Sequence, residues 1–301
     1  MLVAAVTQTA PRPFCSAPAA AGRRRMQGSG MKKTLRTVLL LFFAGTLVFS
    51  VWKLLSIHGS YQEGQNGYAD LEQYVSFQEG TKPHFSEETV PQETSPADVP
   101  ESTGVPDLSA WPLVDFGQLS QINPDIVGWI FIEGTDINYP VVQGADNDYY
   151  LQHLFNGTYN GAGCIFLDAG CASDFSDRHS ILYGHHMKDG SMFSDLMGYK
   201  DQSFYEEHAV ALFVTPTAYY KIRFFSGYVA HVTEDAWKLR FDDIDFTVWL
   251  NELQSKSCFE SDYVPSGDDR IFTLSTCTYE FASARFVLHG YVSESITLKS
   301  K

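Results

Sequence analysis

Short runs of β-branched and aromatic residues, separated by turn residues, dominate the chain after about residue 125. The separators include Asn156-Gly157 and Asn160-Gly161, dipeptides that are typical of turns. No regular alternation of strand and helix patterns accompanies these runs, so a parallel α/β sheet is not indicated. The pattern predicts a mainly β fold: a mainly antiparallel barrel with helical insertions. The predicted strands cover 127–132, 137–142, 163–167, 180–183, 210–214, 218–228, 271–276 and 286–292.

Helical patterns are few in this part of the chain. A short amphipathic helix is predicted over 116–122, ending before Asn123-Pro124. A longer helix is predicted to begin after Asp242, a residue suited to the N-cap, and to run to about Ser255. Its apolar residues Phe246, Trp249, Leu250 and Leu253 recur at helical spacing.

The N-terminal region has a different pattern, an uncharged run from 37 to 52 that follows Lys32, Lys33 and Arg36. Lys53 interrupts the run, and its side chain could snorkel so that the apolar stretch continues to Ile57. We predict a single-pass membrane signal anchor over 31–57, with everything after it outside the cell because the cationic flank stays inside. A cleaved signal peptide is the alternative, but no cleavage site of small residues follows the run.

Three further segments complete the predicted organisation. Residues 1–30 are rich in Ala, Pro, Gly and Arg and are interpreted as a disordered cytoplasmic tail or as an extension upstream of the true start codon. Residues 58–107 are interpreted as an extracellular stalk and linker, because 60–78 could form a helix and 79–107 collect Pro, Glu, Ser and Thr. The folded body is predicted to cover 108–301.

Charge is distributed unevenly and changes the choice of partners. Residues 1–57 hold eight of the 21 basic residues and no acidic one, so the remainder carries 13 basic and all 36 acidic residues, a formal net charge of −23. A body this acidic is repelled by nucleic acid, which excludes DNA- and RNA-binding functions. The five cysteines include no C-x-x-C pair, so neither a dense disulfide framework nor a zinc ribbon is indicated.

Candidate chemistry lies between the last two predicted strands. If these strands pair, Cys277 ends one and Arg285 begins the next, so a thiol and a guanidinium share one rim of the sheet. A nearby cation favours the thiolate, and Arg can also hold an oxyanion. A lone Cys is more often a small buried residue, but Ser275, Thr276 and Thr278 suit a polar strand end better than a core.

A cysteine nucleophile needs a base, and one of the nine histidines has a comparable position. His185 follows an apolar strand and Gly184, so it also lies at a strand end. The adjacent pair His185-His186 could instead suggest a metal site, but no third ligand lies at a useful spacing.

Several of these motifs resemble the class B sortases. The resemblance rests on Thr273-Leu-Ser-Thr-Cys277 with Arg285 eight residues on, and on Tyr183-Gly-His185-His-Met-Lys-Asp-Gly. It extends to Asn123-Pro-Asp-Ile-Val-Gly-Trp129, Ile137-Asn-Tyr-Pro-Val-Val-Gln143 and Asp146-Asn-Asp-Tyr-Tyr-Leu151, and it covers about 108–295. It implies a sortase-type closed antiparallel β-barrel in which the helix near 242–255 is the insertion typical of that class.

The resemblance also implies a mechanism. Cys277 would be the nucleophile that attacks a Thr carbonyl in a C-terminal sorting signal, and His185 the general acid and base. Arg285 would stabilise the oxyanion or position the peptide, Ser275 is a candidate substrate contact, and His186 is interpreted as a neighbour of the base. The implied partners are surface proteins with an Asn-Pro-x-Thr-like signal, a cell-wall precursor amine and, through the anchor, the membrane. No cofactor and no metal is implied, and no calcium-binding loop motif is present.

Three alternatives stay open on the sequence alone. A cysteine peptidase of another fold would hydrolyse without an acceptor amine, although the expected caspase- and papain-type signatures are absent. An anchored binding protein would use Cys277 only structurally. Within the family, the acceptor could be a wall amine or a pilin lysine.

Overall fold

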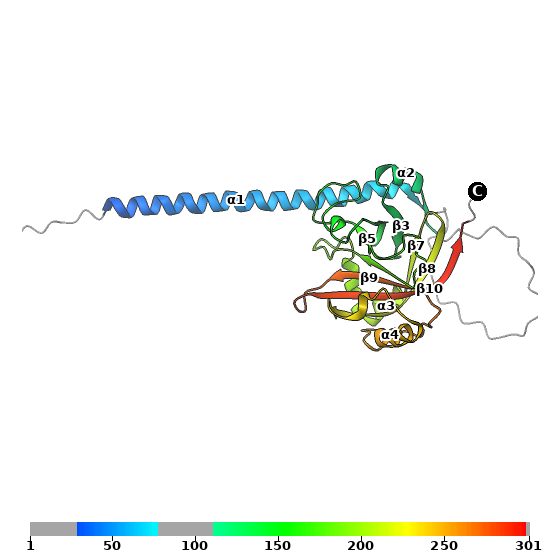
Figure 1. The fold of residues 1–301 in the computed structure, drawn as a ribbon. Coiled ribbons are helices and arrows are strands. Elements are labelled where there is room, and N and C mark those ends of the chain that lie inside the picture. Colours follow the sequence, from blue (N-terminus) through cyan, green and yellow to red (C-terminus); the bar gives the residue numbers. More distant parts are fainter. Residues whose placement is uncertain (1–28, 78–110, 299–301) are drawn as a thin grey trace, which may run out of the picture. The chain divides into compact units, whose positions relative to one another are not determined.

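The chain is described here by a computed structural model, which covers residues 29–77 and 111–298. Two compact units divide it at residues 55 and 56, and the second unit contains all the strands. The helices and strands shown in Figure 1 are α1 (Ser29–Ala69), η1 (Asp70–Tyr74), β1 (Val75–Ser76), β2 (Leu113–Val114), α2 (Phe116–Ile122), β3 (Ile126–Phe131), β4 (Asn138–Val142), η2 (Tyr149–Leu151), β5 (Ile165–Leu167), β6 (His179–Tyr183), η3 (Ser194–Lys200), α3 (Gln202–Glu207), β7 (Val210–Val214), β8 (Ala218–His231), η4 (Asp235–Trp237), α4 (Asp243–Ser255), β9 (Ile271–Cys277) and β10 (Ala284–Thr297).

Eight strands close into a barrel in the order β10-β8-β7-β3-β4-β5-β6-β9, which confirms the predicted barrel. Each predicted strand is present, with bounds shifted by a few residues. The sheet is mixed, however, because β4 pairs with β5 and β6 pairs with β9 in parallel. Parallel neighbours need a long connection between them. The chain provides it with residues 143–164 between β4 and β5 and with residues 184–270 between β6 and β9.

The parallel pairing of β6 and β9 determines where the chemistry lies. Tyr183 is the register partner of Ser275, so the carboxyl ends of the two strands meet at one rim of the barrel. β10 is antiparallel to β9 on its other side and begins at the same rim, with Arg285 opposite Cys277. The consecutive strands β9 and β10 and the distant strand β6 therefore bring their ends to one place.

The barrel interior is filled by large aromatic side chains. Trp129, Phe166, Phe213 and Phe272 are all essentially inaccessible to solvent. Phe272 stacks on Phe175 with ring centroids 5.7 Å apart and lies 5.4 Å from Phe213. Burial of several such rings anchors the strands that carry the site, at about 1.5–3 kcal/mol for each fully buried side chain.

The insertion between β8 and β9 contains α4, as predicted, and Asp242 is its N-cap. The Asp242 side chain accepts a hydrogen bond from the backbone N–H of Asp245 at 2.8 Å. The buried face of α4 presents Phe246, Trp249, Leu250 and Leu253 to a second apolar cluster that also contains Phe225 of β8 and Val287 of β10. This cluster fixes the insertion on the outside of the β8–β10 ribbon.

The folded body starts earlier in the sequence than the predicted residue 108. Tyr68 of α1 and Leu71 of η1 are buried in the main core, and β1 pairs with β2. The apolar residues of 60–78, which were interpreted as a stalk, instead cover part of the barrel. Residues 1–28 of the predicted tail over 1–30, and most of the predicted linker, lie outside the described residues.

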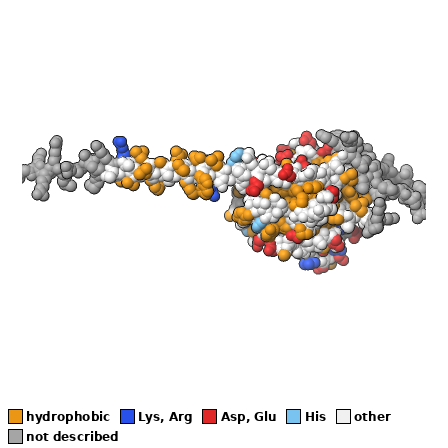
Figure 2. All heavy atoms as spheres, turned by 90° about the horizontal axis from the view of Figure 1, so that it is seen from above, with side chains coloured by type: hydrophobic (Ala, Val, Ile, Leu, Met, Phe, Trp, Pro, Cys, Tyr) orange, Lys and Arg blue, Asp and Glu red, His pale blue; other side chains and the backbone are white. Residues whose placement is uncertain are grey.

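The first part of α1 has the length and composition of a membrane span. The side chains of the apolar run in α1 are exposed, and they cover the helix in Figure 2. In the helical stretch that starts at Thr34, a window of 18 residues has a mean hydropathy of 2.2. The helix does not end near Ile57, the predicted end of the anchor, but continues to Ala69.

Candidate active site

The thiol and the guanidinium predicted to share a rim lie opposite each other on neighbouring strands. Cys277 is the last residue of β9 and is the register partner of Arg285, the second residue of β10. Directly opposed residues of an antiparallel pair have Cβ atoms roughly 4.5–5.5 Å apart. Both side chains are half-buried, so they are accessible to a ligand and partly shielded from water.

His185 reaches the same rim from the end of β6. The backbone N–H of Gly184 donates to the Ser275 carbonyl at 3.1 Å, which continues the β6–β9 pairing up to the histidine. A side chain at Gly184 would collide with Ile165 and Phe193, since an added Cβ would lie 2.4 Å from Ile165 Cδ1. Glycine is therefore required immediately before His185 for tight packing.

The ring of His185 is oriented by a backbone carbonyl. Its Nε2 lies 2.8 Å from the Leu151 oxygen. A carbonyl oxygen only accepts hydrogen bonds, so Nε2 carries a proton and donates it. The other ring nitrogen, Nδ1, is then left to interact with the thiol of Cys277 at the same rim.

Electrostatics at the rim favour a thiolate. The hydrogen bond with His185 lowers the pKa of the Cys277 thiol, and the charge of Arg285 lowers it further, although partial burial opposes both. The same hydrogen bond raises the pKa of His185, against the effect of burial. Because the two groups titrate as a coupled pair, these shifts together favour thiolate beside imidazolium.

The guanidinium of Arg285 is available to bind an anion. Its Nη1 donates to the carbonyl of Ala284 at 2.9 Å. No carboxylate in the described ranges 29–77 and 111–298 forms an ion pair with it. A half-buried guanidinium with free N–H groups beside a thiolate can hold the oxygen of a tetrahedral intermediate.

These three side chains open into a pocket of about 220 Å³. One wall is organised by the buried carboxylate of Asp168, which accepts hydrogen bonds from Asn147 Nδ2 at 2.8 Å and from the Tyr183 hydroxyl at 2.9 Å. Asn147 and Leu151 belong to a motif that resembles the family, but no role was predicted for them. The pocket is lined by Asn147, Leu151, Phe166, Tyr183, Gly184, His185, Ser275, Thr276, Cys277 and Arg285.

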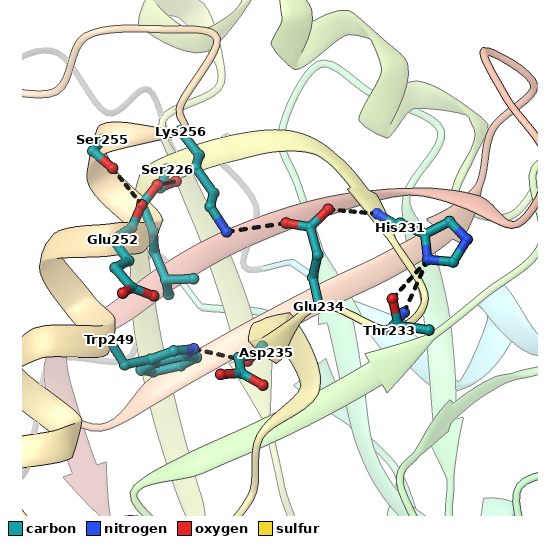
Figure 3. A network of polar contacts seen from close by, with 10 residues as sticks. Ser226, His231, Thr233, Glu234, Asp235, Trp249, Glu252, Ser255 and Lys256 are labelled. Atoms are coloured by element: carbon teal, nitrogen blue, oxygen red, sulfur yellow. Dashed lines mark hydrogen bonds and ion pairs between the residues drawn. The ribbon is translucent and has the colours of Figure 1, made fainter.

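A second hollow shares Tyr183, Ser275 and Arg285 with the first and continues toward the segment between β8 and α4. Figure 3 shows how that segment is fixed: the Glu234 carboxylate accepts from the His231 backbone N–H at 2.7 Å and pairs with Lys256 at 3.0 Å. In the same view, Trp249 of α4 donates to the Asp235 carbonyl at 2.8 Å. This wall of the hollow is thus tied to both β8 and α4.

Ser275, the candidate substrate contact, is 2% exposed. Its hydroxyl oxygen accepts from Trp237 Nε1 at 3.1 Å, and its carbonyl accepts from Gly184. Ser275 therefore joins the two hollows and also holds Trp237 of η4 in place. Trp237, for which no role was predicted, lines the second hollow.

His186 lies beside the pair and faces the backbone. Its Nδ1 donates to the Cys277 carbonyl at 3.1 Å, and its ring lies 5.7 Å from that of Tyr279. No group of three or more potential metal ligands is present among residues 29–77 and 111–298.

The remaining buried cysteines have no comparable activation. Burial raises the pKa of Cys164 to about 12 and that of Cys171 to about 11. Both thiols are free. Among the described cysteines, only Cys277 has a lowered thiol pKa.

Comparison with known proteins agrees with this geometry. No family model matches the chain. Sortase B of Listeria monocytogenes is 38% identical over 177 residues, which are 57% of this chain and 71% of that protein. Sortase B of Staphylococcus aureus is 39% identical over 176 residues, which are 58% of this chain and 72% of that protein.

Solved structures give the same result. Sortase B from Bacillus anthracis, in complex with AAEK1, superposes with a TM-score of 0.62 at 32% identity, covering 78% of this chain and 99% of that one. A Staphylococcus aureus sortase B–substrate complex superposes with a TM-score of 0.57 at 36% identity, covering 61% of this chain and 85% of that one. The barrel, the cysteine at its rim and these relatives agree: the chain belongs to the sortase B family of cysteine transpeptidases.

Proposed function

We propose that this chain is a membrane-anchored transpeptidase that cleaves a C-terminal sorting signal after Thr and transfers the protein to an amine of the cell wall. The observation that carries the proposal is the opposition of Cys277 and Arg285 across β9 and β10, with His185 lining the same pocket. The Staphylococcus aureus relative with a bound substrate supports a protein substrate of this kind. An Asn-Pro-x-Thr-like signal is the first candidate.

In the acylation step, the Cys277 thiolate attacks the Thr carbonyl carbon and a C–S bond forms. The carbonyl oxygen becomes an oxyanion, which the guanidinium of Arg285 stabilises. Collapse of this intermediate breaks the C–N bond, and the imidazolium of His185 gives its proton to the departing amine. A thioester on Cys277 and a neutral His185 remain.

The second step is the reverse of acylation, with a different amine. An incoming amine attacks the thioester carbon, and His185 takes a proton from it. The C–S bond breaks, the thiolate is restored, and a new amide joins the two substrates. His185 is again an imidazolium, so protons balance over the cycle. The hydrogen bond from Nε2 to Leu151 holds the ring through both steps.

The proposed topology places the apolar part of α1 in the membrane and the barrel outside the cell. The exposed apolar run and the preceding Lys32, Lys33 and Arg36 support this orientation. Surface labelling of intact cells would test it: a cysteine-free variant carrying one new cysteine at Ser295, an exposed residue of β10, should react with a membrane-impermeant reagent.

The activity is tested with the full-length chain in detergent micelles, quenched sorting peptides, and mass spectrometry of the products with and without an amine acceptor. We expect cleavage after Thr, an acyl adduct on Cys277, and an amine-capped product. Cys277→Ala and His185→Gln should each abolish turnover, whereas His231→Gln, at a partly exposed histidine of β8 that lines neither hollow, should not. Cleavage at unrelated bonds with no capped product would show a peptidase instead, and a chain that shows no cleavage would contradict the proposal.

A further inference from the structure

The carbonyl that orients His185 is itself held in place by a glycine. Gly163 has a φ of +59°, a left-handed conformation that residues with a side chain rarely adopt. An added Cβ at this position would lie 2.5 Å from the Tyr150 oxygen and 2.8 Å from the Leu151 oxygen. The Gly163 backbone therefore lies directly against the carbonyl that accepts from His185.

Gly163 is in turn held by α1, an element outside the barrel. The buried hydroxyl of Tyr68 donates a hydrogen bond to the Gly163 carbonyl and lies 3.2 Å from Cys164 Sγ. The next residue, Cys164, donates its backbone N–H to the Tyr150 oxygen at 2.9 Å. The hydroxyl of Tyr68 is thus connected to η2 through the Gly163 carbonyl and the backbone N–H of Cys164.

The hydroxyl of Tyr68 keeps its proton over the whole working pH range, since burial raises its pKa well above the usual value. Its ring packs edge-on against that of Tyr139, with centroids 5.2 Å apart. Removal of the hydroxyl alone would leave this ring packing in place and would release the Gly163 carbonyl. The contact can therefore be tested with little change in the core.

We propose that Tyr68 is a positioning residue for the transpeptidation: through Gly163 it fixes the Leu151 carbonyl, and so it holds the His185 ring with one nitrogen toward Cys277. The proposal deepens the proposed function and rests on the roles assigned there to Cys277 and His185. It predicts that a contact on α1 changes the reactivity of the thiol although α1 contributes no residue to the pocket that contains Cys277.

The test uses the full-length chain in detergent micelles with Tyr68→Phe and the matched control Tyr199→Phe. Tyr199 is also a buried tyrosine whose hydroxyl donates to a backbone carbonyl, that of His208, at 2.6 Å. Two readouts are needed: the pH midpoint of Cys277 alkylation by iodoacetamide, followed by mass spectrometry, and kcat and KM for a sorting peptide.

We expect Tyr68→Phe to raise the alkylation midpoint and to lower kcat about tenfold, with KM unchanged, because misplacement of a catalytic group costs rate more than binding. Tyr199→Phe should leave the midpoint and kcat as in the unaltered chain. Equal midpoints and equal kcat for the two variants would overturn the proposal. The alkylation readout needs no sorting peptide, so it tests the coupling even if the proposed cleavage is not observed.

A second pair of variants keeps the test valid if Tyr68→Phe does not fold. Gly163→Ala forces the Leu151 carbonyl to move and should lower kcat about 100-fold. Gly157→Ala introduces similar backbone strain at a φ of +80°, but its nearest neighbour would be the Tyr149 hydroxyl at 3.8 Å. An equal loss of kcat in both glycine variants would show that strain alone is responsible and would refute the positioning role.

Discussion

Residues 56–77, which form the end of α1, η1 and β1, should contribute several kcal/mol to the stability of the barrel. We compare two fragments, 56–301 and 78–301, which differ only in residues 56–77. The shorter fragment loses the buried side chains of Tyr68 and Leu71, which are 9% and 6% exposed, and also the strand that pairs with β2.

The magnitude follows from the burial of these two side chains. Each contributes about 1.5–3 kcal/mol, so removal of both should lower the free energy of unfolding by about 3–6 kcal/mol. For a domain of this size that corresponds to a decrease in Tm of roughly 10–20 °C. The single change Leu71→Ala in the longer fragment should give about 2–4 kcal/mol of the same loss, since it leaves a cavity against the main core.

The assay is urea unfolding at equilibrium, followed by tryptophan fluorescence, because Trp111, Trp129, Trp237 and Trp249 belong to both fragments and become exposed on unfolding. Unfolding free energies that agree within about 1 kcal/mol would refute the reasoning. Such a result would mean that 56–77 lie on the barrel without stabilising it, as the stalk interpretation expects. A loss of the expected size shows that the folded body starts before residue 78.

Three further predictions concern the rim and α4. His185→Gln should move the pH midpoint of Cys277 alkylation upward, because the thiol pKa is lowered first by His185; an unchanged midpoint would contradict the ion pair. Gly184→Ala should cost about 1–3 kcal/mol in urea unfolding and lower kcat, since its Cβ would collide with Ile165; full activity would show that the packing relaxes freely. Asp242→Ala should cost about 1 kcal/mol by removing the α4 cap, measured in the same way, and no change would mean that the helix end is satisfied otherwise.

Local patterns in the sequence were sufficient to predict several elements. Asp242 and the four apolar residues after it marked α4 from its cap to its buried face, because capping and helical spacing are local properties. The pairing of β9 with β10 could also be predicted, because a short connection between two β-type runs favours antiparallel neighbours. The opposition of Cys277 and Arg285 follows from that pairing.

The contacts between distant segments could not be predicted in this way. Nothing local indicates that β6 lies parallel to β9, a pairing that joins residues roughly ninety positions apart and brings His185 to the thiol. The orientation of His185 depends on the backbone oxygen of Leu151. A motif of side chains does not indicate which backbone carbonyl will accept a hydrogen bond. The role of Tyr68 was missed because the composition of 60–78 suits a stalk as well as a helix packed on a barrel.

The closure of the barrel has a consequence for how selectivity changes among relatives. Since β6, β9 and β10 are each paired on both sides at the rim that carries Cys277, an extended peptide there cannot be recognised by joining the sheet as an extra strand. Discrimination among peptides must then depend on side chains at the rim and on the connections that overhang it, from β8 to α4 and from β9 to β10. Connections of this kind tolerate insertion and substitution, whereas the strands do not. New peptide preferences can therefore arise by loop exchange, while the barrel keeps the thiol, the imidazole and the guanidinium in register.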